Sequence, residues 1–208
     1  MADIQIASVD APLNRLTLLS AAFGLVLRAS AVGLLSDRDR IEHLDIALLR
    51  EIARAAAAQG IGKEAALGLL QGDLSPARLA TLIGRLDDAL SQSPLPDREL
   101  RELRRTFELE QLADLLGTSV VSLRRYLGGT RSVPDGVAAR AHWLALVVAD
   151  LAGSYNPIGV RRWFERPRAQ LDGRSPRQAL GQDWTPDQPS AGQVRDLATA
   201  LVGAGAAT

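Results

Sequence analysis

The chain has 208 residues, which is enough for one large domain or two small ones. Its 24 basic and 24 acidic residues cancel, so the protein as a whole is not a polyanion binder, and a nucleic-acid surface requires local segregation of charge. The absence of cysteine excludes disulfides, thiolate catalysis and thiolate zinc sites, and the two histidines, His43 and His142, lack metal-ligand spacing. We therefore expect a folded protein that binds no metal and no cofactor.

The first part of the chain has helical spacing and no persistent strand-like alternation. The apolar run 16–27 is too short to span a bilayer and predicts a buried helix within 13–35. Residues 37–58 predict a second helix, because one helical face collects the apolar residues Ile41, Leu44, Leu48, Ile52 and Ala55.

Two further helices are expected before residue 93. One covers 63–71, and the other begins with Ser75 as N-cap and Pro76 at the first helical position. The stretch 91–97 contains two prolines and two serines and is typical of a linker. Residues 1–93 are thus predicted to form a helical N-terminal module. The sequence leaves its role open: its apolar helices can form an oligomerisation interface or a self-contained core, and ligand sensing is a further alternative.

Two helices joined by a short turn are predicted over 109–129, LEQLADLLGTSVVSLRRYLGG. Gly117 allows the chain to reverse at positive φ, and Ser119 can cap the second helix. The positions expected to face inward are Leu109, Leu112, Ala113, Leu116, Leu123, Tyr126 and Leu127. This pattern predicts a helix-turn-helix region over 97–132, whose second helix is available for the DNA major groove. A packing hairpin that binds no DNA is the alternative.

Six residues are candidate DNA contacts because they lie on the outer face of the second helix or in the loop after it: Ser119, Val121, Ser122, Arg124, Arg125 and Arg131. Arginine makes bidentate contacts to guanine or clamps phosphates, and serine hydroxyls bond phosphates or base edges. Seven arginines and five acidic residues lie in 101–140, which is a modest local excess of positive charge.

The remainder, 133–208, is predicted to form a small helical C-terminal module that opens with a long apolar helix after Pro134. Pro167 ends the short helix of NPIGVRRWFER, and Gly173 allows a turn. The S-P-x-Q sequence from Ser175 to Gln178 then supplies an N-cap, a first-position proline and a capping-box partner.

Trp163 and Phe164 are adjacent on the helix that Pro167 ends, so their side chains cannot point the same way. We expect Phe164 to pack in the core with Leu171 and Leu180. Trp163 is then expected nearer the surface, where it would serve as an interface anchor.

The residues of this module resemble those of the MbcA/ParS/Xre antitoxin family. The resemblance covers about 105–203 and rests on a helix-turn-helix followed by two spaced motifs, with the residues Trp163, Phe164, Pro167, Leu171, Gly173, Ser175, Pro176 and Leu180. The resemblance implies a type II antitoxin that binds a toxin that attacks NAD or ADP-ribosylates a target, and that represses its own operon as an oligomer. It places the toxin-facing surface around 161–180 and 194–208, and it does not explain the N-terminal hundred residues.

The arginines of 161–177 have three interpretations. The segment contains six arginines and two acidic residues, Glu165 and Asp172. The arginines can form a partner surface or add phosphate contacts to the helix-turn-helix. They can also be a solvated face, because all basic residues of this chain except Lys63 are arginine. The candidate partner-binding residues are Arg161, Arg162, Trp163, Arg166, Arg168 and Arg174. A catalytic cluster is disfavoured because no nucleophile–base pair, histidine or glycine-rich phosphate loop accompanies them.

The sequence thus predicts an all-α, cytoplasmic, homo-oligomeric protein that is not an enzyme. Its expected partners are a double-stranded operator and a cognate toxin, with no membrane. Two alternatives stay open. One is a stand-alone helix-turn-helix transcription regulator with an N-terminal sensing or oligomerisation module, and the other is a protein-interaction adaptor without DNA binding.

Overall fold

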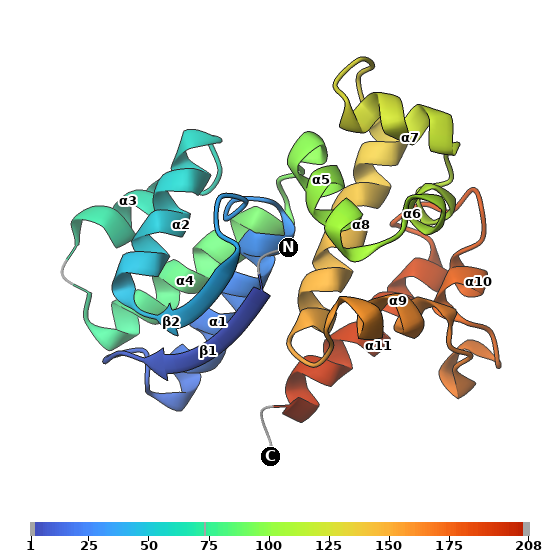
Figure 1. Ribbon diagram of the computed structural model, residues 1–208. Helices are drawn as coiled ribbons and strands as arrows, with labels where there is room; N and C mark the ends of the chain where they lie inside the picture. The colour runs from blue at the N-terminus through green and yellow to red at the C-terminus, as the bar shows by residue number, and fades with distance from the viewer. Residues whose placement is uncertain (1–2, 73, 206–208) are drawn as a thin grey trace. The chain divides into compact units, whose positions relative to one another are not determined.

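The computed structural model describes residues 3–72 and 74–205, with side chains described up to Leu201. Within these residues the protein has eleven α-helices, one 3-10 helix and one two-stranded sheet (Figure 1). The chain divides into two compact units, with the boundary between Pro94 and Leu95. The prediction of a largely helical protein is confirmed, and the sheet is the exception to it.

The N-terminal unit begins with a β-α-β arrangement. The strands β1 (Asp3–Val9) and β2 (Arg40–Leu44) are parallel, and α1 (Leu16–Ala31) connects them. Ile4 lies opposite Ile41 and Val9 opposite Leu44, with an irregularity in the register between Ile4 and Ser8. Half of the residues of α1 are buried, most of them in its second half, whereas Leu16 at its start is 71% exposed.

The prediction of a helix over 37–58 is wrong for its first part, because Arg40–Leu44 is a strand. Ile41 and Leu44 are both buried, so their spacing of three also fits a helical face, and only pairing with β1 decides between the two conformations. Asp45 separates strand from helix, since its side chain accepts a hydrogen bond of 2.7 Å from the Leu48 amide and caps α2 (Ile46–Ala58).

The N-terminal unit is completed by α3 (Lys63–Gln71) and α4 (Pro76–Ser91). α2 packs on α3, and α4 packs on both α1 and α3. Arg28 of α1 forms an ion pair of 2.6 Å with Asp87 of α4. Gly68 permits the close approach of α3 to α4, because a Cβ there would lie 2.6 Å from Leu82 Cδ2.

The C-terminal unit is built around a long buried helix, α8 (Asp135–Ala152), in which every residue from Trp143 to Ala149 is buried. α5, α9 and α11 pack against α8. His142 of α8 lies 2.6 Å from the fully buried Glu99 carboxyl of α5. The other elements are α5 (Pro96–Thr106), α6 (Leu109–Leu115), α7 (Val120–Leu127), α9 (Pro157–Glu165), a 3-10 turn (Ala169–Leu171), α10 (Pro176–Leu180) and α11 (Pro189–Gly205).

The short helices of this unit begin and end where the sequence predicts. α9 ends at Glu165, ahead of Pro167, and Gly173 has a φ of 77°. Ser175 and Gln178 form a full capping box at the start of α10, with Gln178 N donating to Ser175 Oγ and Ser175 N donating to Gln178 Oε1.

Among the described residues, no single helix has both the length and the apolar character needed to cross a membrane. α8 and α9 meet these criteria only as a pair, and they are bent by 115° relative to each other.

Candidate functional site

A tight turn joins α6 to α7 at Gly117. Its φ of 61° lies in the left-handed region that favours glycine. The Gly117 and Thr118 amides donate back to the carbonyls of Asp114 and Ala113, at 3.0 and 2.9 Å, and so close the end of α6. A Cβ at position 117 would collide with Arg140 Nη1 and would lie 2.5 Å from the Gln182 carbonyl oxygen. Conformation and space therefore both require glycine here.

α7 is fixed by its cap and by its inner face. Ser119 Oγ accepts a hydrogen bond of 3.1 Å from the Ser122 amide, as predicted for an N-cap, and it also bonds the Ser122 hydroxyl at 3.0 Å. The inner residues Leu123 and Tyr126 are buried, and Leu127 is half-buried. The small Ala113 of α6 is buried as well.

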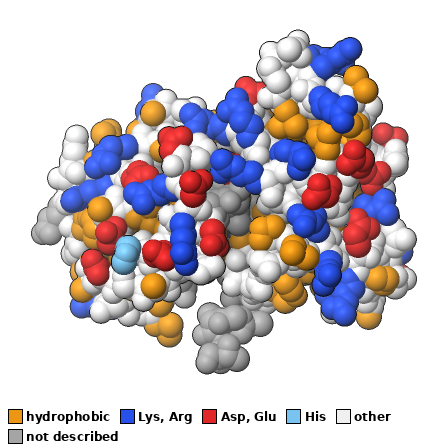
Figure 2. Space-filling model, in the orientation of Figure 1, with side chains coloured by type: hydrophobic (Ala, Val, Ile, Leu, Met, Phe, Trp, Pro, Cys, Tyr) orange, Lys and Arg blue, Asp and Glu red, His pale blue; other side chains and the backbone are white. Residues whose placement is uncertain are grey.

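The outer face of α7 carries one exposed stripe at helical spacing. Val121, Arg124 and Arg125 are exposed, and Val121 retains 58% of its accessible surface. Within the described part of the chain, neither Arg124 nor Arg125 has an ion-pair partner. Figure 2 shows basic and hydrophobic side chains side by side over the α7 end of this unit. This stripe presents two unpaired cations and one apolar group to solvent.

The other candidate DNA contacts lie around this stripe. Arg131 is exposed in the loop after α7, with its guanidinium 5.8 Å from the centre of the Tyr126 ring. Ser119 is exposed and Ser122 is half-buried, and their hydroxyls are engaged in the cap. All six predicted residues therefore gather at α7 and the loop that follows it.

The second candidate surface is a groove of about 680 Å³ beside α9. It is lined by five of the six predicted partner-binding residues, together with residues from α6 and its N-cap, from α9 and from the loop before α9. The lining residues are Glu108, Gln111, Tyr155, Gly159, Arg161, Arg162, Trp163, Glu165, Arg166 and Arg168. Arg162 and Arg166 are exposed and have no ion-pair partner among the described residues. The Nε of Arg168 is buried and also lacks a hydrogen-bond acceptor within the described residues. The groove thus offers cationic donors that the fold itself does not use.

The prediction that Trp163 lies near the surface is wrong, because this side chain is only 2% exposed. Phe164 is fully buried, as predicted, and its ring packs edge-on against Phe107 at 5.4 Å. Trp163 is covered from another direction, since the Arg168 guanidinium lies 5.3 Å from its ring centre. The Trp163 and Phe164 rings also pack edge-on against each other at 5.1 Å, so Trp163 lines the groove as a buried side chain and is not an exposed anchor.

Two of the predicted partner-binding arginines have structural roles. Arg161 Nη1 donates to the Thr106 carbonyl at 2.8 Å and so ties α9 to the end of α5. Arg174 does not line the groove; its Nε donates to the Leu171 carbonyl at 3.3 Å, and its guanidinium lies 3.8 Å from Asp172. Arg162, Arg166 and Arg168 are the arginines left for a partner.

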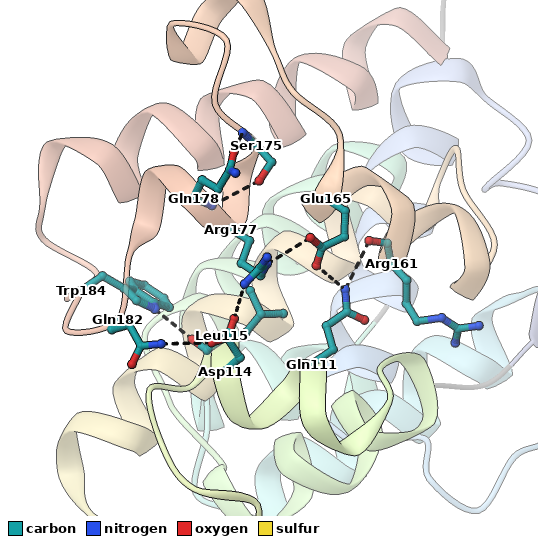
Figure 3. Close-up of polar contacts among 10 residues, drawn as sticks. All are labelled: Gln111, Asp114, Leu115, Arg161, Glu165, Ser175, Arg177, Gln178, Gln182 and Trp184. Carbon is teal, nitrogen blue, oxygen red and sulfur yellow. Dashed lines mark hydrogen bonds and ion pairs between the residues drawn. The ribbon is translucent and has the colours of Figure 1, made fainter.

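A polar network, drawn in Figure 3, connects α6 with α9 and α10. Arg177 of α10 donates to Asp114 of α6 at 2.8 Å and to Glu165 of α9 at 3.0 Å. These hydrogen bonds to the two carboxylates, that to Asp114 more than that to Glu165, raise the pKa of Arg177. Glu165 also accepts from Gln111 of α6 at 3.0 Å, and Gln182 donates to Asp114 at 3.3 Å.

The end of α6 is held by two side chains from later in the chain. Trp184 donates its indole N–H to the Leu115 carbonyl at 2.9 Å, and Arg140 donates to the Leu116 carbonyl at 2.9 Å. Arg140 also donates to the Trp184 carbonyl at 2.6 Å. The roles of Arg140 and Trp184 were not predicted from the sequence, because the residues around them do not indicate hydrogen bonds to carbonyls so far away in the chain. The signal available was only that Trp184 is one of three tryptophans.

A smaller groove of about 410 Å³ lies in the N-terminal unit, beside the end of β2 and the start of α2. Two of its three lining arginines are paired inside the groove, since Arg38 bonds Glu51 at 2.9 Å and Arg40 lies 3.1 Å from Glu42. This pairing leaves it less suited than the α9 groove to an anionic partner.

Within the described ranges, no group of three or more histidine, cysteine or acidic residues is placed to hold a metal ion. Comparison of the chain with protein-family models, with curated proteins and with solved structures gave no match. The arrangement of α6, α7 and the α9 groove is therefore the basis on which a function is inferred.

Proposed function

We propose that this protein is a DNA-binding repressor of the antitoxin type, which reads its operator with α7 and holds a cognate toxin at the α9 groove. The observation that carries the proposal is the exposed stripe of Val121, Arg124 and Arg125 on a capped helix that follows a glycine turn. In a helix-turn-helix, the second helix enters the major groove and its outward residues contact bases and phosphates. The cations of this stripe have no partner within the described residues, so they are available for phosphates or guanine.

The toxin-binding half of the proposal rests on the arginines of the α9 groove and on the resemblance of 105–203 to the antitoxin family. Arg162 and Arg166 are exposed cations, and the buried Nε of Arg168 is a donor without an acceptor among the described residues. Carboxylates match guanidinium groups in shape and charge, so a toxin surface with acidic side chains fits this groove. In this role the chain binds and does not catalyse.

The DNA-binding half is tested by selection from a random pool. The full-length chain is incubated with double-stranded DNA of random sequence at moderate salt, and the retained duplexes are amplified and sequenced. We expect an enriched motif with two half-sites, because a helix-turn-helix protein usually binds as a dimer. Retention without any sequence enrichment, or no retention, would contradict operator recognition and favour an adaptor.

The toxin-binding half is tested with the product of the neighbouring reading frame. Co-expression should restore growth and yield a complex that survives purification. The double change Arg162→Glu and Arg166→Glu should break this complex, whereas Arg78→Glu and Arg85→Glu, which alter exposed arginines of α4, should not. Absence of a complex with the unchanged chain would leave the stand-alone regulator as the better description.

A further inference from the structure

We infer that Val121 reads the C5-methyl group of a thymine and so sets one base of the operator, an assignment that rests on the proposed function. Val121 is 58% exposed, and it is one of only four large hydrophobic side chains that the described residues leave exposed. The others are Leu16, Leu67 and Ile158, none of which lies on α7. More than half of the Val121 side chain is therefore free to contact an apolar group of a ligand that docks on α7.

The placement of Val121 on α7 points to a base and not to the DNA backbone. It is the second residue of the helix, one turn before Arg124 and Arg125 on the same exposed stripe. The N-terminal residues of a recognition helix contact base edges in the major groove. Arg124 and Arg125 would hold the flanking phosphates or a guanine, because they are the charged members of the stripe.

The two serine hydroxyls beside Val121 are already engaged in the cap of α7. The hydroxyls of Ser119 and Ser122 bond each other at 3.0 Å, and Ser119 also accepts the Ser122 amide. Valine has no donor or acceptor, so it cannot discriminate bases by hydrogen bonds. The thymine methyl is the one apolar group that the four bases present in the major groove.

The test is a double-mutant cycle between one side chain and one methyl group. The probe is the duplex enriched in the selection described above, with each thymine replaced in turn by deoxyuridine, which differs only in lacking the methyl. At one thymine of each half-site, deoxyuridine should weaken binding by the unchanged chain about fourfold, the factor for burying one methyl-sized group. In Val121→Ala the same replacement should change the affinity little.

Two further variants keep the result interpretable. Val121→Thr retains one of the two methyl groups and should retain part of the sensitivity to deoxyuridine. Ile158→Ala shortens an apolar side chain of similar exposure on α9 and should respond to deoxyuridine as the unchanged chain does. Equal affinities of the unchanged chain and Val121→Ala for a duplex with every thymine replaced would show that the alanine variant is folded.

The inference is overturned if no thymine is sensitive to the replacement, or if Val121→Ala is as sensitive as the unchanged chain. Either outcome leaves operator binding itself intact, since an enriched duplex is still bound. If the selection enriches no duplex, the proposed operator recognition fails and the inference fails with it. The two failures are therefore distinguishable.

Discussion

Trp184 donates its indole N–H to the carbonyl of Leu115, the last residue of α6, at 2.9 Å and across 69 positions of sequence. The last carbonyls of an α-helix have no partner within the helix, and a buried carbonyl without a donor is costly. Trp184 is itself only 1% exposed, so the bond lies in the core of the unit. A side chain near the C-terminus thus completes the helix that precedes α7.

The first prediction concerns this bond. Trp184→Phe removes the donor and should lower the free energy of unfolding of the C-terminal unit by about 1–3 kcal/mol, because the Leu115 carbonyl stays buried. Urea unfolding followed by circular dichroism measures the loss. Trp143→Phe makes the same change in the other ring of this edge-to-face pair, whose centres are 4.8 Å apart, and so measures the part of the loss that comes from packing. Equal losses would show that the carbonyl bond contributes little.

The second prediction separates backbone strain from crowding in the turn. Gly117→Ala should cost more stability than Gly129→Ala, although both residues have positive φ, of 61° and 68°. Strain alone is common to both and is on the order of 1 kcal/mol. Only at position 117 would the new Cβ meet Arg140 and the Gln182 carbonyl, whereas nothing lies within 4 Å at position 129. Thermal unfolding of the two variants side by side is the measurement, and equal shifts would contradict the role of crowding.

The third prediction concerns the charges of α7. Arg124→Ala with Arg125→Ala should weaken binding to the selected duplex and reduce the slope of log affinity against log salt by roughly 1.8, the value for two lost phosphate contacts. Arg78→Ala with Arg85→Ala removes the same charge from α4 and should leave that slope unchanged. Affinity measured at several salt concentrations decides the outcome. An unchanged slope in the α7 variant would mean that these arginines do not contact phosphates.

The fourth prediction concerns acid stability in the N-terminal unit. The hydrogen bond from Arg38 lowers the pKa of the Glu51 carboxyl below its usual range. A lowered pKa in the folded state means that the pair stabilises the unit above the unfolded pKa of about 4.3 and that this contribution is lost as the pH falls through the folded value. Both groups are partly exposed, so the contribution is small.

Nuclear magnetic resonance of the Glu51 carboxyl against pH measures the effect directly. In Arg38→Ala the pKa of Glu51 should rise toward its ordinary value. Arg40→Ala removes a cation from the same groove and should move this pKa less, because Arg40 faces Glu42. A Glu51 pKa that is unaltered in Arg38→Ala would contradict the assigned cause.

Local signals in the sequence were sufficient for the turn between α6 and α7. Gly117 and Ser119 each act on neighbouring backbone groups, so their types predict a left-handed residue and an N-cap without knowledge of the fold. The capping box at Ser175 was predictable for the same reason. Helix ends of this kind depend on residues within one turn.

Features that depend on distant residues were not predictable. Ile41 and Leu44 fit a helix as well as a strand, and only β1 makes them a strand. Trp163 is buried although its neighbour Phe164 is buried too, and the alternation of inner and outer faces on an isolated helix does not predict this. The roles of Arg177 and Trp184 likewise require knowledge of which carbonyls and carboxylates lie beside them.

The two donors at the end of α6 also determine whether the α6–α7 segment can be transplanted. Arg140 and Trp184 supply the hydrogen bonds to the Leu116 and Leu115 carbonyls, and both lie beyond residue 132. A peptide of 97–132 would leave these carbonyls to water and would lose the surface against which Gly117 is fitted. The α6–α7 segment is therefore not self-contained, and grafting it onto another scaffold requires that α8 and the 181–184 segment go with it.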